Sequence, residues 1–380
     1  MPQIKPEVET FARIKVIGVG GSGKNALNHM VNSKLKGVDF IAVNTDSQDL
    51  HHSLAKRRIH IGKNLTKGLG AGMNQEIGKR AAEETKEEIQ EAIKGADMVF
   101  IAGGEGGGTG TGAAPVVART AKELGVLTIA VVTKPFSFEG QQRMRLAEAG
   151  IEELRKSVDA IIIIPNDKLL SAISKDTTAK QAFMMCDEIL KQAVEGISDL
   201  ITTPGTIGNI DFADIRAVLE NAGSALMGIG TASGEKRAEE AAKAAINSPL
   251  LDLSIHGAKG VLFSIAGSDD LTMFEIQEAS KVITESVDPN AKIIFGTVHD
   301  EKLKKGEVKV TVVAAGFPDS AQKKTLFEGG KIFNSMPSTP PPAREEILER
   351  KPDVETVKGI DEDDDDWGAV PAFLRRSKLK

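Results

Sequence analysis

A glycine-rich stretch, Gly103 to Ala114, has the composition and the position of a phosphate-binding loop. It follows the apolar run Met98 to Ala102 and precedes a segment with the apolar spacing of a helix. Glycine reaches positive φ angles and has no Cβ, so consecutive backbone N–H groups can converge on an anion where the helix begins. A flexible linker is the alternative, but linkers seldom lie directly between a buried strand and an amphipathic helix. The expected donors are backbone or hydroxyl groups of Gly107, Gly108, Thr109, Gly110 and Thr111.

Two more glycine-rich loops occur earlier in the chain. Gly18 to Asn25 follows the apolar segment Ile14 to Ile17 and precedes a helical pattern. It satisfies G-x-G-x-x-G and also G-x-x-x-x-G-K, but Asn25 replaces the Ser or Thr with which a P-loop binds magnesium. Each match is weak alone, and what they share is a second phosphate-facing turn before a helix. Gly68 to Asn74 is the third loop of this kind.

Apolar segments of strand length alternate with helical patterns through the first half of the chain. This alternation predicts an α/β fold, with a parallel sheet covered by helices on both faces. Such sheets bind ligands at the carboxyl ends of their strands, where Asn44 and Asp46 stand, although an Asx turn with a helix cap explains these two residues equally well. The predicted strands are 14–17, 40–43, 58–61, 98–102, 126–132 and 160–164.

Several patterns between these strands have ordinary structural explanations. Gln75 to Lys94 reads as one long helix with a charged, solvated face. Glu139 and Arg143 have the i,i+4 spacing of a surface ion pair. Pro165 to Asp167 is predicted to form a turn.

The second half of the chain begins with a long amphipathic helix, predicted over 177–201, whose apolar face is wide enough to join two domains. Asp211 and Asp214 follow it, three residues apart at the start of another helix, and therefore share one face. A smaller α/β unit without a phosphate loop comes next. Its strands are predicted at 225–229, 261–266, 292–296 and 308–314.

Composition excludes several classes of protein. With 48 Lys and Arg against 54 Asp and Glu, the net charge of -6 gives no basis for nucleic acid as the main partner. The single cysteine, Cys186, excludes an intramolecular disulfide and a Cys-based zinc site, which favours a reducing cytoplasmic compartment. We see neither a secretion signal nor an apolar run near the ~18 residues of a spanning helix, so we expect a soluble protein.

The composition changes after Phe317. Prolines cluster at 337–342 and an acidic run covers Asp361 to Asp366, which predicts a disordered linker over 317–366. The remaining residues, 367–380, carry the only tryptophan, further apolar residues and two adjacent arginines. This combination is typical of a docking peptide that orders on a partner, whereas a frayed terminus is more often polar throughout.

These motifs resemble the tubulin and FtsZ superfamily, and within it bacterial FtsZ, along nearly the whole chain. Gly106 to Gly112 matches the family signature, and the other loops occur in the family's order. The resemblance implies a Rossmann-like parallel-sheet GTPase domain, a long central helix, a second smaller α/β domain and a disordered C-terminal tail. The implied boundaries are 1–12 for a flexible N-terminus, 13–176 for the GTP-binding domain, 177–201 for the central helix, 202–316 for the C-terminal domain with a catalytic loop, 317–366 for the linker and 367–380 for a partner-binding peptide.

The resemblance also implies a site for GTP or GDP, with Mg²⁺ carried by the nucleotide and no metal ligands assigned to the protein. Glu139 and Asn166 are implied to contact the ribose, and Arg143 to lie near the nucleotide. Phe183 is implied to stack on the guanine, and Asp187 to hydrogen-bond its Watson–Crick edge. Beyond the phosphate loop, the implied nucleotide-binding residues are Gly20, Gly21, Ser22, Gly23, Lys24, Asn25, Asn44, Asp46, Gly70, Ala71, Gly72, Met73, Pro135, Glu139, Arg143, Asn166, Phe183 and Asp187.

One residue of the phosphate loop departs from the family pattern. Glu105 stands where members usually have an apolar residue. A carboxylate beside phosphates should repel them unless it points to solvent or to a cation.

The residues near the glycine loops include no obvious base for activating water. The family's solution is head-to-tail assembly, in which an acidic loop of one subunit completes the site of the next and builds filaments. On this pattern Asp211 and Asp214 polarise the water and Asn209 supports them, although a helix cap is the alternative role for Asp211.

The implied protein forms the cytokinetic ring at midcell. Its implied partners are further copies of itself and membrane-anchoring division adaptors such as FtsA. The adaptors would bind the tail through Val370, Pro371, Phe373, Leu374, Arg375 and Arg376.

Two other classes remain open at this point. A nicotinamide-dependent oxidoreductase would use the G-x-G-x-x-G turn, but it leaves the second and third glycine loops unexplained. A filament scaffold without hydrolysis would keep the binding loops and lose the acidic pair, which this sequence retains.

Overall fold

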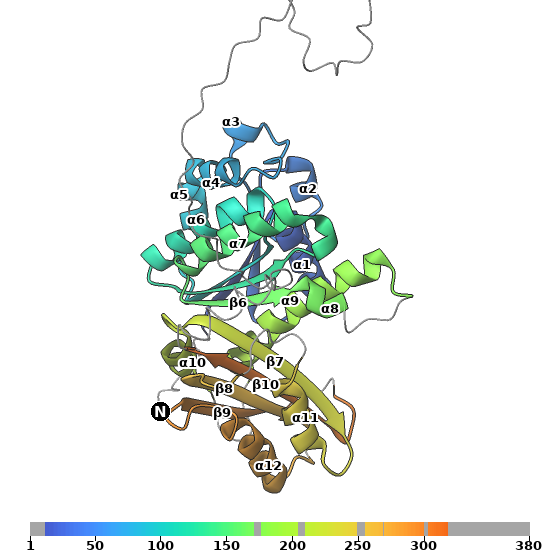
Figure 1. The fold of residues 1–380 in the computed structure, drawn as a ribbon. Helices are drawn as coiled ribbons and strands as arrows, with labels where there is room; N and C mark the ends of the chain where they lie inside the picture. The colour runs from blue at the N-terminus through green and yellow to red at the C-terminus, as the bar shows by residue number, and fades with distance from the viewer. Residues whose placement is uncertain are drawn as a thin grey trace, which may run out of the picture. The chain divides into compact units, whose positions relative to one another are not determined.

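The computed structural model describes residues 12–170, 176–203, 210–248, 255–268, 270–299 and 303–317. Within these ranges the ten strands form one sheet, in the order β3-β2-β1-β4-β5-β6-β7-β10-β8-β9 (Figure 1). The strands are β1 (Ile14–Val19), β2 (Val38–Asn44), β3 (Arg57–His60), β4 (Met98–Gly104), β5 (Leu127–Lys134), β6 (Ala160–Pro165), β7 (Gly223–Ser233), β8 (Gly260–Gly267), β9 (Lys292–His299) and β10 (Glu307–Ala315).

Helices cover this sheet (Figure 1). The longest is α9 (Ala179–Thr202), which begins at a capping box formed by Thr178 and Gln181. The others are α1 (Gly20–Asn32), α2 (Ser47–His51), α3 (Lys63–Thr66), α4 (Gln75–Glu84), α5 (Lys86–Ile93), α6 (Thr109–Glu123), the 3-10 helix η1 (Ser137–Glu139), α7 (Gln141–Arg155), α8 (Asn166–Leu170), α10 (Phe212–Leu219), α11 (Arg237–Ile246) and α12 (Met273–Thr284).

The first six strands are parallel, as predicted, and their carboxyl ends lie at the same edge of the sheet. Val19 at the end of β1 pairs with Val43 of β2, and Gly104 at the end of β4 pairs with Thr133 of β5. The loops that follow these strands are therefore neighbours. Two buried apolar clusters pack on this part of the sheet, one including helices α1 and α9 and the other including α4, α5, α6 and α7. The α/β fold class is confirmed.

The second α/β unit continues the same sheet. Residues 160–162 of β6 pair in parallel with residues 223–225 of β7. Beyond β7 the strand β10 is antiparallel to both of its neighbours, β7 and β8. Ala241 of α11 and Ile283 of α12 pack with Phe263 of β8 in a separate core. The second unit thus has its own apolar core, although its strands belong to the same sheet as the first six strands.

Two predicted elements differ from the structure. The charged helix expected over 75–94 is two helices, α4 and α5, which meet at Thr85. The Thr85 hydroxyl donates to the carbonyl of Ala81 and accepts from the N–H of Gly62, so this side chain ties the break to the neighbouring loop. The turn expected at 165–167 is the end of β6 and the first turn of α8. The long helix is confirmed, with its ends moved by one or two residues.

None of the helices within the described ranges has the length and apolar character needed to span a bilayer. The linker and the C-terminal peptide predicted beyond Phe317 lie outside those ranges.

Candidate functional site

A cavity of about 370 Å³ opens at the carboxyl ends of β1, β2 and β4. All three glycine-rich loops contribute to its wall, as their places in the sequence predicted. The implied nucleotide-binding residues that line it are Gly20, Gly21, Ser22, Asn44, Asp46, Gly70, Ala71, Gly72, Met73, Gly107, Gly108, Thr109, Gly110 and Arg143.

The phosphate loop is held by close backbone contacts with both other loops. A Cβ on Gly108 would lie 2.8 Å from the backbone N of Asn74, so only glycine lets the third loop approach. Gly20 has a φ of +73°, and a Cβ there would lie 3.1 Å from the backbone N of Gly110. The Thr111 hydroxyl accepts a hydrogen bond of 2.8 Å from Gly106 N. The three loops therefore pack as one unit around the cavity.

The cavity wall is suited to an anion. Helices α1 and α6 both begin at it, and neither has a side-chain cap or an acidic residue in its first turn. The unpaired N–H groups and the partial positive charge of two helix N-termini therefore act on the same space.

Three of the implied residues in the first loop lie outside the cavity lining. Gly23 packs against the Ala102 carbonyl, and Asn25 is exposed. Lys24 is buried, and its Nζ lies 2.5 Å from Oδ1 of Asp49. The reason is that α1 begins at Gly20, so residues 23–25 are already in its second turn.

Asp49 lines the cavity but was not among the predicted site residues. Its second oxygen accepts a 2.8 Å hydrogen bond from Nδ2 of the buried Asn44, and its N–H donates to Oδ1 of Asp46 at 2.9 Å. Asp46 is thus the N-cap of α2 and also lines the cavity, so the capping explanation of this segment is confirmed and its role in binding a ligand stays a prediction. The capping spacing of Asp46 and Asp49 was the signal in the sequence that pointed to Asp49.

Aromatic residues gather near the start of α9, where the base of the nucleotide was implied. The ring centroid of Phe136 lies 5.4 Å from that of Phe183 and 5.0 Å from that of Phe138. Phe183 is 48% exposed although it lies on the apolar stripe of α9, so this ring has a face available for stacking. Asp187 follows one turn later, and burial raises its pKa to about 6 against the opposing charges of His29 and Lys24.

Between the aromatic residues and the cavity, Glu139 and Arg143 form the predicted ion pair at 3.1 Å. Glu139 also accepts a 2.9 Å hydrogen bond from the N–H of Phe136, which fixes η1. Arg143 lines the cavity, and its Nε is buried without a hydrogen-bond partner within the described ranges. The same is true of Oδ1 of the buried Asn166. Pro135 lies near Gly106, as Arg143 does.

Glu105 meets neither of the two conditions stated for it above. Its side chain is only 3% exposed, no ion pair of Glu105 occurs among the described residues, and a Cβ on Gly150 would lie 2.7 Å from its Oε2. Its Oε2 is buried without a partner in the described structure. Burial raises the pKa of Glu105 to about 7, while the hydrogen bond from Thr111 acts in the opposite direction.

Asp211 and Asp214 lie together at the start of α10 in a capping box. Asp211 Oδ1 accepts from Asp214 N at 2.8 Å, and Asp214 Oδ2 accepts from Asp211 N at 3.4 Å. The capping role expected as the alternative is therefore real, and it leaves one oxygen of each carboxylate unused by the box. Asn209 lies outside the described residues, as do the tail residues from Val370 to Arg376.

The acidic pair and the cavity lie at opposite edges of the sheet. Thr202 at the end of α9 contacts Gly37, just before β2, whereas Asn44 at the other end of β2 lines the cavity. The residues after α10 pair with Asp159, just before β6. Seven residues of β2 span roughly 23 Å, so the two acids do not face the cavity of their own chain.

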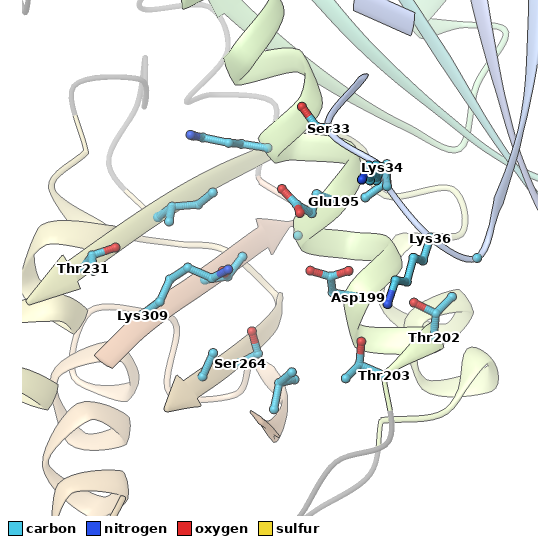
Figure 2. Close-up of a pocket in the computed structure, with 18 of the residues that line it drawn as sticks. Ser33, Lys34, Lys36, Glu195, Asp199, Thr202, Thr203, Thr231, Ser264 and Lys309 are labelled. Carbon is cyan, nitrogen blue, oxygen red and sulfur yellow. The ribbon is translucent and has the colours of Figure 1, made fainter. Parts of the chain in front are cut away.

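A larger cavity, of about 730 Å³, lies between α9, the turn after α1 and the strands β7, β8 and β10. Figure 2 shows Glu195 and Asp199 on α9 and Lys309 on β10 around it. None of the described residues implied to bind nucleotide or to act in catalysis lines this space. Within the same ranges no group of His, Cys, Asp and Glu side chains forms a metal site.

Comparison with known proteins assigns most of the described chain. Residues 13–175 match the family model described as "Tubulin/FtsZ family, GTPase domain", and residues 223–318 match "FtsZ family, C-terminal domain". An empty FtsZ dimer from M. jannaschii is 47% identical with a TM-score of 0.77, and the match covers 81% of this chain and 89% of that one. CetZ2 from Haloferax volcanii, in a GTPγS-bound protofilament, is 22% identical with a TM-score of 0.70, covers 84% and 97% of the two chains, and is similar in fold.

Proposed function

This chain belongs to the tubulin/FtsZ family, and from that membership we propose that it is a GTPase whose active site is completed by a second copy of itself. The observation that carries the proposal is the separation of two half-sites. A cavity suited to an anion lies at the carboxyl edge of the sheet, and a pair of acids, the exposed Asp211 and the half-buried Asp214, lies at the amino edge. The structures of an FtsZ dimer and a CetZ2 protofilament support self-association.

We place the phosphates of GTP at the N-termini of α1 and α6, where the glycine loops present backbone N–H groups. The ribose then lies toward Glu139 and Asn166, whose unpartnered Oδ1 fits a ribose hydroxyl donor. The base lies toward Phe183 and Asp187. A carboxylate at Asp187 matches the two adjacent N–H donors on the Watson–Crick edge of guanine, which is the reason to prefer GTP to ATP. Mg²⁺ bound to the phosphates supplies charge neutralisation, and we assign it no protein ligand.

The cavity contains two carboxylates, and both already have structural partners. Asp49 binds Lys24 and Asn44, and Asp46 caps α2. Neither is positioned as a base for water. We therefore propose that Asp211 and Asp214 of the next subunit orient and polarise the attacking water through the oxygens that the capping box leaves unused. Asn209 is proposed to support them.

Exposed apolar side chains support a head-to-tail contact. Leu69 is 86% exposed beside the cavity residue Gly70, and Met73 lines the cavity with its side chain half-exposed. On the C-terminal unit, Phe274 is 68% exposed in the first turn of α12. Large exposed apolar residues favour a protein partner, and a contact between two different faces of one chain propagates as a filament.

At the cellular level we propose that these filaments form the cytokinetic ring at midcell in the cytoplasm. The C-terminal peptide would attach them to a membrane-anchoring adaptor of the FtsA type. The apolar and arginine residues at 370–376 support this, because such a segment suits a groove with an acidic rim.

The proposal is tested by measuring GTP turnover per subunit over a range of protein concentrations, with sedimentation in GTP and in GDP. Turnover is expected to rise steeply once GTP-dependent pellets appear. Equal turnover per subunit in dilute, unassembled protein would show that one chain holds the whole active site.

Lys24 provides a prediction about charge in the cavity. Replacing it with methionine leaves the Asp49 carboxylate uncompensated beside an anion, so GDP affinity should fall about tenfold, which is the effect of roughly one pKa unit of interaction. The double variant Lys24→Met, Asp49→Asn should regain affinity within about twofold of wild type in calorimetric titration. A double variant as weak as the single one would show that Lys24 contacts the nucleotide itself.

From the role proposed for Asp187 we expect the affinity for nucleotide to fall at low pH. Its carboxylate must be ionised to accept both guanine donors, and its pKa is raised to about 6 in the free protein. Below that pH the acid is neutral, and GDP affinity should fall by up to about tenfold per pH unit. The variant Asp187→Asn should bind weakly at every pH from 5 to 7. A wild-type affinity that stays constant over this range would contradict the assignment.

A further inference from the structure

Glu105 is a buried acid directly behind the phosphate loop. It lies next to Gly104 and two residues before Gly107, both of which line the cavity. Its side chain points away from the cavity toward α7, where a Cβ on Gly150 would lie 2.7 Å from Oε2. Because Gly150 leaves this space, the carboxyl group is enclosed between the loop and the helix.

The groups around Glu105 connect it to the loop. Its backbone N–H donates to the carbonyl of Thr133 on β5 at 2.9 Å. The hydroxyl of Thr111, in the first turn of α6, hydrogen-bonds the Glu105 side chain and accepts from the N–H of Gly106. One hydroxyl thus links the acid to the turn that precedes the phosphate-binding glycines.

The charged groups nearby do not compensate an ionised Glu105. The first turn of α6 has no charged residue, and Thr133 is the contact from β5. From α7, Arg143 lies against Gly106, but its guanidinium is paired with Glu139. Asp46 and Asp49 face the cavity from the other side of the loop. A negative charge on Glu105 would therefore be buried with one weak partner, close to the proposed phosphates.

We propose that Glu105 must be neutral for an anion to occupy the adjacent cavity at full affinity, so that nucleotide binding takes up a proton at this side chain. The inference rests on the proposed function, which places nucleotide phosphates in the adjacent cavity. The neutral acid adds no charge behind the loop. The ionised acid places an unpaired buried charge there and repels the phosphates, and the one hydrogen bond from Thr111 only partly offsets this.

The direction in which nucleotide affinity changes with pH follows from the two protonation states of Glu105. The pKa of Glu105 is about 7 in the free protein because of burial, and a bound anion raises it further. Below pH 7 the side chain is already neutral and has no effect on affinity. Above pH 7, the affinity for the nucleotide falls about tenfold per pH unit until the pH passes the pKa of the bound form. The total loss is therefore about tenfold for each pKa unit that the nucleotide adds.

The test is calorimetric titration of the full chain with GDP from pH 6.5 to 8.5. The variants are Glu105→Gln, Glu105→Met and the control Glu148→Gln, which changes an exposed acid on α7. Wild type and Glu148→Gln should lose about tenfold in affinity across the range, whereas Glu105→Gln and Glu105→Met should each change by less than about twofold. Titration of the GDP phosphate and of Asp187 is common to all four proteins and cancels in the comparison.

Repeating the titration at pH 7.5 in buffers of different ionisation enthalpy measures directly how many protons the protein takes up with GDP. Wild type is expected to take up more protons than a folded Glu105 variant does. A wild-type affinity without alkaline loss, or variants that lose affinity as wild type does, overturns the inference while the nucleotide site stands. Absence of GDP binding at every pH refutes the nucleotide site itself, and the inference with it.

Discussion

Replacing Asp211 with asparagine is expected to lower GTP turnover by at least about 100-fold, the usual effect of losing a group that handles the proton of the attacking water. Asparagine keeps the oxygen that caps α10, because the Asp211 side chain contributes to the capping box only by accepting the bond from Asp214 N to its Oδ1. Folding stability and GDP affinity should therefore match wild type. The measurement is phosphate release at a protein concentration at which the wild type sediments fully.

The variant Asp211→Ala separates catalysis from capping. It should lose turnover to the same extent and in addition lose about 1 kcal/mol of stability, since alanine provides no cap. Normal turnover in the asparagine variant, with loss in the alanine variant alone, would mean that Asp211 only caps the helix. Pelleting with GTP should persist in both, because their nucleotide cavities are unchanged.

Replacing Gly112 with alanine is expected to cost about 3 kcal/mol of stability or more, at the upper end for overpacked sites. A Cβ at this position would clash with the carbonyl of Gln75 and lie 2.7 Å from the backbone N of Lys79. Both atoms belong to the backbone of α4, which cannot move aside as a flexible side chain can. The result would push α4 away from α6 and separate the third glycine loop from the phosphate loop.

Gly107→Ala is the matched control, because a Cβ there meets no heavy atom within 4 Å. Urea denaturation should show a large decrease in the free energy of unfolding for Gly112→Ala. For Gly107→Ala this free energy should change by less than about 0.5 kcal/mol. Similar stability of the two variants would contradict the packing described for α4 and α6.

The sequence predicted the fold because its signals were local and periodic. Runs such as Met98 to Ala102 are apolar on both faces, and the pattern of Phe183, Cys186 and Leu190 has the helical period, so strands and long helix could be located directly. The break at Thr85 was missed because it depends on a hydrogen bond from Gly62, which is distant in sequence. The continuity of the sheet from β6 to β7 was missed for the same reason, since pairing is not encoded in either strand alone.

The candidate site was predicted less completely than the fold. Glycine spacing located the three loops, but motif matching could not tell which side chains enter the cavity. Lys24 pairs with Asp49 because the helix begins earlier than a P-loop pattern implies. Glu105 is buried because Gly150, on another helix, leaves room for it. Both outcomes depend on tertiary contacts.

The match to a GTPase-domain family favours GTP over a nicotinamide cofactor, which the G-x-G-x-x-G turn alone left open.

The central claim is that each chain carries two halves of different active sites. Mixing two variants, each defective in one half, at a GTP concentration too low for Asp187→Asn to bind it tests this claim most directly. Asp211→Asn keeps the cavity and lacks the acid, whereas Asp187→Asn keeps the acid and lacks the guanine contact. In an equal mixture, a random filament joins an intact cavity to an intact acid at about one contact in four, so turnover should recover to about a quarter of the wild-type rate. A mixture whose turnover is no more than the average of the two separate variants would contradict the claim.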